Sequence, residues 1–385
     1  MEFKMKRIHI LRIFIITLLL ISFSTVFVKA ADNNTIIGEQ TQKSGAGDLY
    51  QQTPDSAKKS LGNMGIKAPD KSSLSNFSPA GLFKFVAGKL VEAAKAPLKA
   101  VTALFGILLA CALLNTMKNS FGEKPLKSVF DIVCTLCIAA VLLVPVSQCI
   151  SYAAQIITDS ANFMLTFLPV FVTLVAASGH PASAVTFQGL LVMASQFISQ
   201  IAATTFVPMV DMYLAFCVIG SISPGVNIGS IAGFVRKVVN FGLILSITIF
   251  TGILTVQGLI SQAADTVTIK TAKFVVGSVV PVIGSVISEA VNTVVSCANL
   301  LKTTTGAFAI VVFIVTFLPP LLNCLMWMLA TDLSIAIAEI LGIDNVTGLL
   351  KAVKETLKLL IALILTAALA MIVSVSVMLL LGMNS

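Results

Sequence analysis

The sequence predicts an all-α, polytopic membrane protein, and three observations lead to this fold class. Hydrophobic residues make up 57% of the 385 residues, and charged residues make up only 11%. The apolar residues gather in long stretches, and the charges lie almost entirely between these stretches. Several of the stretches are short for a membrane span or are interrupted by Pro. A soluble chain of this length needs more charge to cover its surface, so the solvent for most of this chain must be a lipid bilayer.

Residues 1–30 have the order of a secretory signal peptide. Basic residues precede the uncharged apolar run 13–28, and small residues lead to Ala30. We therefore expect cleavage after Ala30; the alternative is an uncleaved first anchor helix. Residues 31–80 are rich in Ser, Asn, Gln, Lys and Gly and carry too few apolar residues to bury a core. This composition predicts an exported flexible tether.

The next segments predict the first contacts with the membrane. Residues 81–96 place apolar side chains on one helical face and charged side chains on the other. Such a helix can lie flat in the membrane interface, the alternative being a helix packed on a soluble partner. Residues 97–150 contain two transmembrane helices, 98–117 and 128–150. The loop between them is rich in Lys, so the positive-inside rule places it in the cytoplasm.

The remainder of the chain predicts an internal duplication, with repeat 1 at 161–260 and repeat 2 at 274–382. Landmarks such as Thr205–Pro208 and Thr316–Pro319 recur at offsets of 110–115 residues. A basic stretch precedes the last span of each repeat, so both repeats should have the same orientation. We expect four crossings per repeat and ten in the whole chain. The repeat spans are 161–178, 185–207, 208–226, 241–260, 274–288, 303–319, 320–342 and 359–381.

Acidic residues in or beside the apolar stretches are candidates for a polar path or for packing between helices. An aspartate at a helix centre costs about 2.5–3.5 kcal/mol to insert on translocon scales, so it usually faces protein or water rather than lipid. A surface-facing acid near the interface is the alternative. The candidates are Asp131, Asp211, Glu289, Asp332 and Glu339.

Basic residues on amphipathic stretches before the last span of each repeat are candidates for cytoplasmic docking of an acidic partner. The alternative is that these stretches are interfacial helices that orient the spans which follow. The candidates are Arg236, Lys237, Lys351, Lys354 and Lys358.

The sequence offers little for catalysis. It contains no HExxH, Walker A or GxGxxG pattern, and its one histidine outside the signal is His180. A zinc site usually needs three or four converging ligands. Cys134 and Cys137 have CxxC spacing but lie within an apolar span, where thiols act as small hydrophobic groups. We therefore expect no enzymatic activity, no cofactor, no metal and no nucleic-acid partner.

In order and combination, these features resemble the stage III sporulation protein AE family. The resemblance rests on the signal, the polar tether, Gly81-Leu82-Phe83 at the start of the amphipathic helix, and the Ser223-Pro224-Gly225 and Thr316–Pro319 stretches. It implies a multi-pass protein of the mother-cell membrane that surrounds the forespore. It also implies a non-enzymatic role in a channel, or feeding-tube, assembly related to secretion systems and required for endospore development.

The resemblance further implies partners other than the lipid bilayer. These are the other proteins of the stage III sporulation A operon, including a secretion-type ATPase and ring-forming proteins, and stage II sporulation protein Q across the intermembrane space. The alternative function is a stand-alone secondary transporter for a small solute, which the repeats and the membrane acids suggest. Co-purification with an ATPase would distinguish the two.

Overall fold

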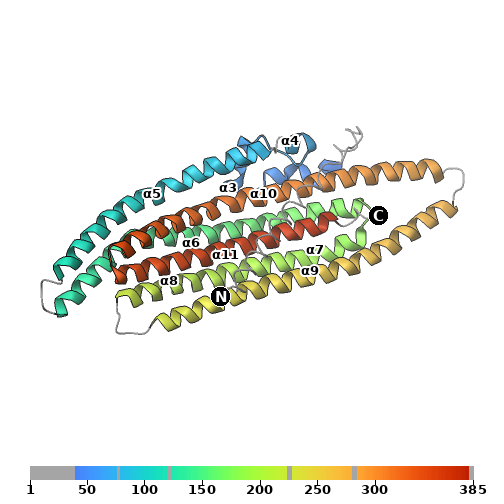
Figure 1. Ribbon diagram of the computed structural model, residues 1–385. Coiled ribbons are helices and arrows are strands. Elements are labelled where there is room, and N and C mark those ends of the chain that lie inside the picture. The colour runs from blue at the N-terminus through green and yellow to red at the C-terminus, as the bar shows by residue number, and fades with distance from the viewer. Residues whose placement is uncertain (1–39, 76–78, 119–123, 223–227, 280–283, 381–385) are drawn as a thin grey trace.

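The computed structural model describes residues 40–75, 79–118, 124–222, 228–279 and 284–380, and the regular elements within these ranges are all helical (Figure 1). Side chains within 257–292 are outside the description. The main elements are α5 (Pro79–Lys118), α6 (Lys124–Ala177), α7 (Pro181–Ile201), the π-helical turn η2 (Ala202–Phe206), α8 (Val207–Ile222), α9 (Gly229–Val279), α10 (Gly284–Ile340) and α11 (Asp344–Leu380).

The long helices form an elongated bundle in which consecutive helices run in opposite directions, with α7, η2 and α8 acting as one continuous helix (Figure 1). The last residues of α5, α8 and α10 and the first residues of α6, α9 and α11 therefore lie at one end of the bundle. We call this the basic end, because Lys118 and Lys124, which flank the loop predicted to be cytoplasmic, lie there. The last residues of α6 and α9 and the first residues of α7 and α10 lie toward the opposite end.

Within the described residues, six helices are long and apolar enough to cross a membrane, judged by length and composition. At about 1.5 Å per residue, the 57 residues of α10 extend for about 85 Å, far more than a hydrocarbon core of about 30 Å. Only part of the bundle can therefore lie in lipid at any one time.

These six long helices replace the ten shorter spans that the sequence predicts. Helix α6 joins the spans expected at 128–150 and 161–178, and α10 joins those expected at 303–319 and 320–342. The prediction treated proline as a break, but α5, α6 and α10 contain proline within the helix. Membrane helices tolerate proline because neighbouring helices and hydroxyl side chains satisfy the freed backbone groups.

The turn η2 shows how one proline is accommodated. Pro208 lacks an N–H group, so the carbonyl of Thr204 cannot receive the usual helical hydrogen bond. The chain widens here into a π-helical turn, and the Val207 N–H reaches back to the Ala202 carbonyl. The spans expected at 185–207 and 208–226 are consequently one helix with a local bulge.

Part of the segment predicted as a flexible tether is folded. It contains η1 (Ala46–Tyr50), α3 (Asp55–Asn63) and α4 (Lys71–Ser75), and these contact α6 and α10. Leu49, Leu61 and Ile66 are fully buried. The tether prediction is wrong here because a few spaced apolar residues gain cover from an existing helical surface. The signal region lies outside the described residues.

The predicted interfacial helix at 81–96 is the first half of α5 rather than a separate element. It continues through Pro97, which is buried, into the first membrane span. In this half of α5, Phe83 of the predicted apolar face is 75% exposed, and Lys84 of the predicted charged face is also exposed.

The core lies where α6, α10 and α11 meet. Phe163, Phe167 and Phe171 form a ladder on one face of α6, with consecutive ring centroids 6.0 and 5.0 Å apart. Phe313 of α10 meets the first ring edge-on at 5.6 Å. Such pairs add about 0.5–1.5 kcal/mol each beyond their buried area. This cluster fixes the relative positions of α6 and α10.

Candidate functional site

A set of ion pairs links α9, α10 and α11 near the basic end, and we call it the charged layer. Its position follows from the pattern of α11. Val346, Leu350, Val353 and Leu357 are fully buried, which leaves the charged residues on the opposite side of the same turns. The members of the layer are Arg236, Asp332, Glu339, Lys351, Lys354, Glu355 and Lys358.

Three of the ion pairs cross between helices. Arg236 of α9 donates to Glu355 of α11 at 3.0 Å, and Lys351 of α11 lies 2.8 Å from Glu339 of α10. Lys354 of α11 pairs with Asp332 of α10. Within α11, Lys358 lies 2.5 Å from Glu355, so this carboxylate holds two cations.

The layer is partly open to solvent. The exposed fractions of its side chains run from 28% for Lys354 to 58% for Lys351. Solvent screens charges at such positions, and each pair then contributes at most about 1 kcal/mol. The layer therefore adds little to stability, and it marks how α9, α10 and α11 align near the basic end.

The five predicted acids fall into different environments. Asp332 and Glu339 belong to the charged layer and pair with lysines. Asp131 is half-buried at the start of α6, where its backbone carbonyl accepts a 2.8 Å hydrogen bond from Thr135. Asp211 is exposed on α8. The side chain of Glu289 lies outside the described residues.

Four of the five predicted docking residues are engaged within the chain. Arg236, Lys351, Lys354 and Lys358 all pair with acids of the charged layer, whereas Lys237 is exposed on α9. The acids and the basic residues, predicted as two separate sets, thus largely form one structure.

Glu355 is the member that the prediction of site residues missed. In the sequence, Glu355 and Lys358 are three residues apart, a spacing at which opposite charges can pair on a helix. Its contact with Arg236 joins residues 119 positions apart and had no local signal.

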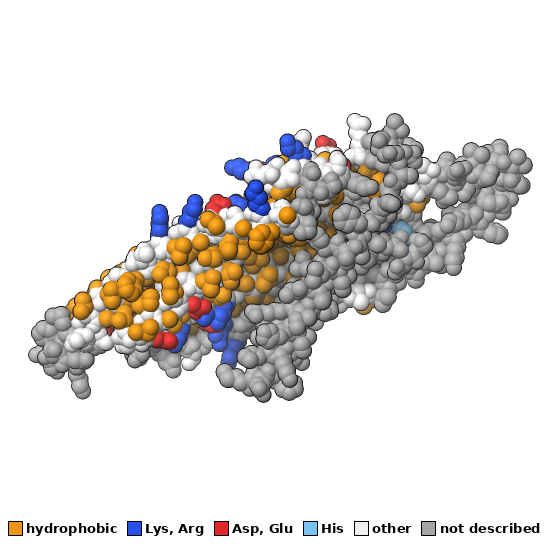
Figure 2. Space-filling model, turned by 45° about the horizontal axis from the view of Figure 1, so that its top comes forward, with side chains coloured by type: hydrophobic (Ala, Val, Ile, Leu, Met, Phe, Trp, Pro, Cys, Tyr) orange, Lys and Arg blue, Asp and Glu red, His pale blue; other side chains and the backbone are white. Residues whose placement is uncertain are grey.

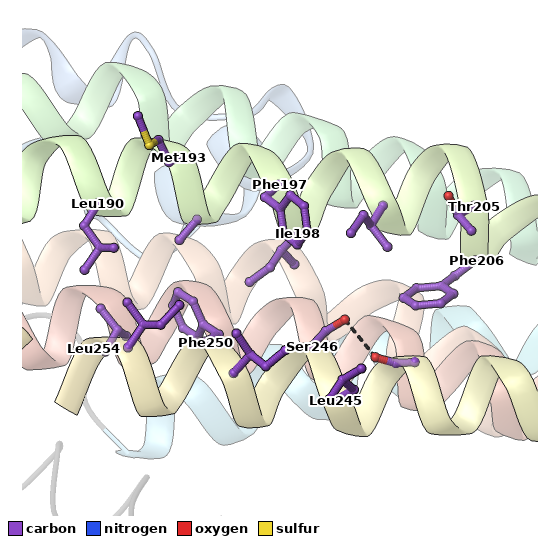
Figure 3. Close-up of a pocket in the computed structure, with 15 residues that line it drawn as sticks. Leu190, Met193, Phe197, Ile198, Thr205, Phe206, Leu245, Ser246, Phe250 and Leu254 are labelled. Carbon is purple, nitrogen blue, oxygen red and sulfur yellow. Dashed lines mark hydrogen bonds between the residues drawn. The ribbon is translucent and has the colours of Figure 1, made fainter. Parts of the chain in front are cut away.

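An apolar groove of about 680 Å³ lies between α7 and α9 (Figure 3). Its polar side chains are Thr205 and Ser246, and the Ser246 hydroxyl donates to the Gly242 carbonyl at 2.8 Å. Phe206 of η2 lies against Gly242, where a Cβ would come within 2.7 Å of the ring. The other lining residues are Leu190, Met193, Ala194, Phe197, Ile198, Ile201, Leu245, Ile249, Phe250, Ile253 and Leu254.

The described residues contain no group of three or more His, Cys, Asp or Glu side chains that could hold a metal ion. Of the CxxC cysteines, which are one helical turn apart on α6, Cys134 is buried and Cys137 is exposed. Cys149 accepts a 3.5 Å hydrogen bond from the Asn323 amide, which contributes to the packing of α6 on α10.

An elongated bundle of long apolar helices, with its interhelical charges held in ion pairs, defines a multi-pass α-helical membrane protein. The chain belongs to the stage III sporulation protein AE family, whose family profile matches residues 69–382.

A curated relative, the stage III sporulation protein AE of Bacillus subtilis (strain 168), is 25% identical over 329 residues, covering 86% of this chain and 81% of the relative. No solved structure matches the chain. The resemblance predicted from the sequence is confirmed, and the chain is a sporulation-family membrane protein.

Proposed function

We propose that this protein is a non-enzymatic, integral-membrane component of the channel complex between mother cell and forespore. In this role it helps form a secretion-like apparatus that endospore development requires. Its proposed location is the mother-cell membrane around the forespore, reached by a chain whose signal peptide has been removed.

The charged layer is the observation that carries this proposal. Three helices are linked near the basic end by the pairs Arg236–Glu355, Lys354–Asp332 and Lys351–Glu339. A scaffold that binds other proteins needs such a fixed surface, whereas a catalyst needs a nucleophile or a proton donor aimed into a pocket. Lys237 is exposed beside the layer and adds a positive charge to this surface.

The proposed partners follow from family membership. They are the other stage III sporulation A proteins, including a secretion-type ATPase and ring-forming proteins, and stage II sporulation protein Q across the intermembrane space. We assign the basic end to the cytoplasm, where an ATPase would work, because Lys118 and Lys124 lie there and the nearby parts of α9 and α11 carry further basic residues.

A stand-alone transporter for a small solute is the second candidate. Membrane acids such as Asp332 suggested it, but in the structure Asp332 and Glu339 are paired with lysines near one end. The groove between α7 and α9 is lined almost entirely by apolar side chains, which do not suit a polar solute. These observations favour the complex component.

The test uses the full-length chain, tagged and expressed in its sporulating host. Detergent extracts should yield the secretion-type ATPase and ring-forming proteins together with the tagged chain, and deletion of the gene should abolish spore formation. A doubly substituted chain, Glu355→Gln with Asp332→Asn, should insert into the membrane but recover less ATPase. Normal spore yield after deletion, or solute uptake by the purified chain alone in liposomes, would contradict the proposal.

A further inference from the structure

The exposed surface of α5 is uncharged near the basic end and carries lysines among apolar side chains such as Leu98 and Val91 farther along. Near the basic end Phe105, Leu109 and Leu113 are exposed, at 46%, 41% and 68%. Farther along, the exposed side chains include Lys95 and Lys84. This half of α5 therefore has a lysine face, which consists of Lys84, Lys89, Lys95 and Lys99, with Glu92 paired to Lys89 at 2.7 Å.

The charges on α9 lie at the other end of its exposed surface. Near the basic end it carries Arg236 and Lys237 beside Phe234, which is 66% exposed. Farther along, Ile244, Ile249 and Ile253 are exposed at 66%, 52% and 47%. Helices α5 and α9 lie on opposite sides of the bundle, since α5 packs on α6 and α10 while α9 packs chiefly on α7, α8 and α11 (Figure 1).

Contacts between the helices place these positions on a common scale along the bundle. Asn115 of α5 donates to the Gly342 carbonyl at 3.5 Å, and α5 runs parallel to α10, so Phe105 is level with Asp332. Asp332 pairs with Lys354, whose neighbour Glu355 pairs with Arg236 of α9.

Phe105 and Arg236 therefore share one level. Lys95 and Ser246 share another, about 15 Å farther from the basic end. At the first level α9 carries charges and α5 carries none, and at the second level α5 carries charges and α9 carries none.

Helices α6 and α7 repeat the pattern. On α6, Val129, Val133 and Val144 are exposed in the part near the basic end, and Ser147 and Gln155 are exposed beyond them. On α7, which is remote from the basic end, Val185, Met193 and Phe197 are exposed at 72%, 74% and 63%. Figure 2 shows the apolar side chains as a band that lies between two groups of charged side chains.

We infer that the bilayer crosses this bundle obliquely. Hydrocarbon covers the α5–α6 face next to the basic end and the α7–α9 face farther along. The lysine face of α5 lies at the headgroups of the leaflet away from the basic end and binds anionic phospholipid. A tilt is a known response of a hydrophobic stretch that exceeds the bilayer thickness.

The charges on both sides of the band fit this arrangement. The charged layer lies on the basic-end side of the α9 band, and the lysine face lies beyond the α5 band, so neither must enter hydrocarbon. In an upright crossing, one of the two would lie in lipid at a cost of about 2.5–3.5 kcal/mol per unpaired charge. Exposed Phe83 and Phe234 beside these charges suit the apolar side of interfacial segments.

Spin labelling of the full chain tests the oblique crossing. All seven cysteines are replaced, and single cysteines at 95, 109, 237 and 249 are labelled in vesicles of phosphatidylcholine and phosphatidylglycerol. Positions 109 and 249 should be relaxed by oxygen, and positions 95 and 237 by a water-soluble nickel chelate. A nickel chelate anchored to lipid headgroups should also relax position 95.

Two outcomes would overturn the inference. If positions 95 and 249 both report hydrocarbon, the bundle crosses upright. If position 95 meets soluble nickel but not headgroup-anchored nickel, this face lines a water-filled conduit between copies instead. Unchanged helical content by circular dichroism confirms that each labelled chain is folded.

The binding of anionic phospholipid to the lysine face is tested with two matched variants. The variant K84Q/K95Q/K99Q removes three charges from α5, and K58Q/K59Q/K67Q removes three from the N-terminal segment. Phosphatidylglycerol retained by the purified protein at low salt should fall for the first variant, by about fivefold for each lysine that lies near the surface. Equal retention by the two variants would overturn the assignment of anionic lipid to the lysine face.

Discussion

The guanidinium of Arg236 lies 3.0 Å from the carboxylate of Glu355, although 119 residues separate them in the chain. This contact joins the first turns of α9 to the first turns of α11. Since Glu355 also holds Lys358 at 2.5 Å, one carboxylate balances two cations.

Replacing Glu355 should loosen the charged layer without unfolding the protein. Glu355→Gln leaves two partly exposed cations without their anion, so the free energy of unfolding should fall by about 1 kcal/mol. Thermal unfolding in detergent at low salt measures the change, and high salt should reduce it. Lys237→Gln is the matched control, since no ion pair of the layer includes it; an equal effect there would show that the pair has no special role.

The close approach of α10 and α11 at Gly306 gives a second prediction. A Cβ at this position would lie 2.5 Å from a methyl carbon of Leu379. Gly306→Ala should therefore destabilise the protein by about 1–3 kcal/mol, as overpacking does. Gly348→Ala is the comparison, because nothing lies within 4 Å of its Cβ position and alanine favours a helix by about 1 kcal/mol.

Unfolding midpoints of these two variants should move in opposite directions. Adding Leu379→Ala to Gly306→Ala should recover part of the loss by removing the clash. If Gly306→Ala is as stable as the original chain, the helices are farther apart than the structure places them.

The sequence predicted the helical class correctly because its apolar stretches are long and its charges lie between them. The predicted number of spans was too high because the prolines of α6 and α10, considered from the sequence alone, indicate helix ends. In the folded bundle the helices continue through these prolines, and the contacts with neighbouring helices that allow this are not apparent from the sequence.

The candidate site was predicted in pieces. Asp332 and Glu339 stood out because acids are rare in apolar stretches, and Lys351 and Lys354 stood out because they face away from a buried stripe. That these residues pair depends on how α10 and α11 align, and no local pattern specifies that alignment. The internal duplication remains a prediction.

The sidedness of the bundle can be checked by cysteine accessibility. On a cysteine-free background, Lys124→Cys and Lys237→Cys should both react only after the membrane is permeabilised, because both lie toward the basic end, which we predict to be cytoplasmic. Lys67→Cys, in the exported segment, should react in intact cells. Labelling of positions 124 and 237 from opposite sides would contradict the arrangement of the helices.

Cleavage of the signal gives a fourth prediction. The protein extracted from membranes should begin at Ala31, since small residues at Val28 and Ala30 precede the expected cut. N-terminal sequencing decides it directly. An intact Met1 would mean that the apolar run 13–28 stays as an anchor.

The folded segment from η1 to α4 has a consequence for anything attached to the exported start of the chain. With η1 held against α6, only the residues from Ala31 to Gly45 remain between the expected cleavage site and this anchorage. A chain reaches at most about 3.5 Å per residue, so the new amino terminus stays within about 50 Å of the bundle. A ligand or tag placed there therefore samples only the surroundings of the far end of α6, so a partner bound to it is held near the end of the bundle away from the basic end.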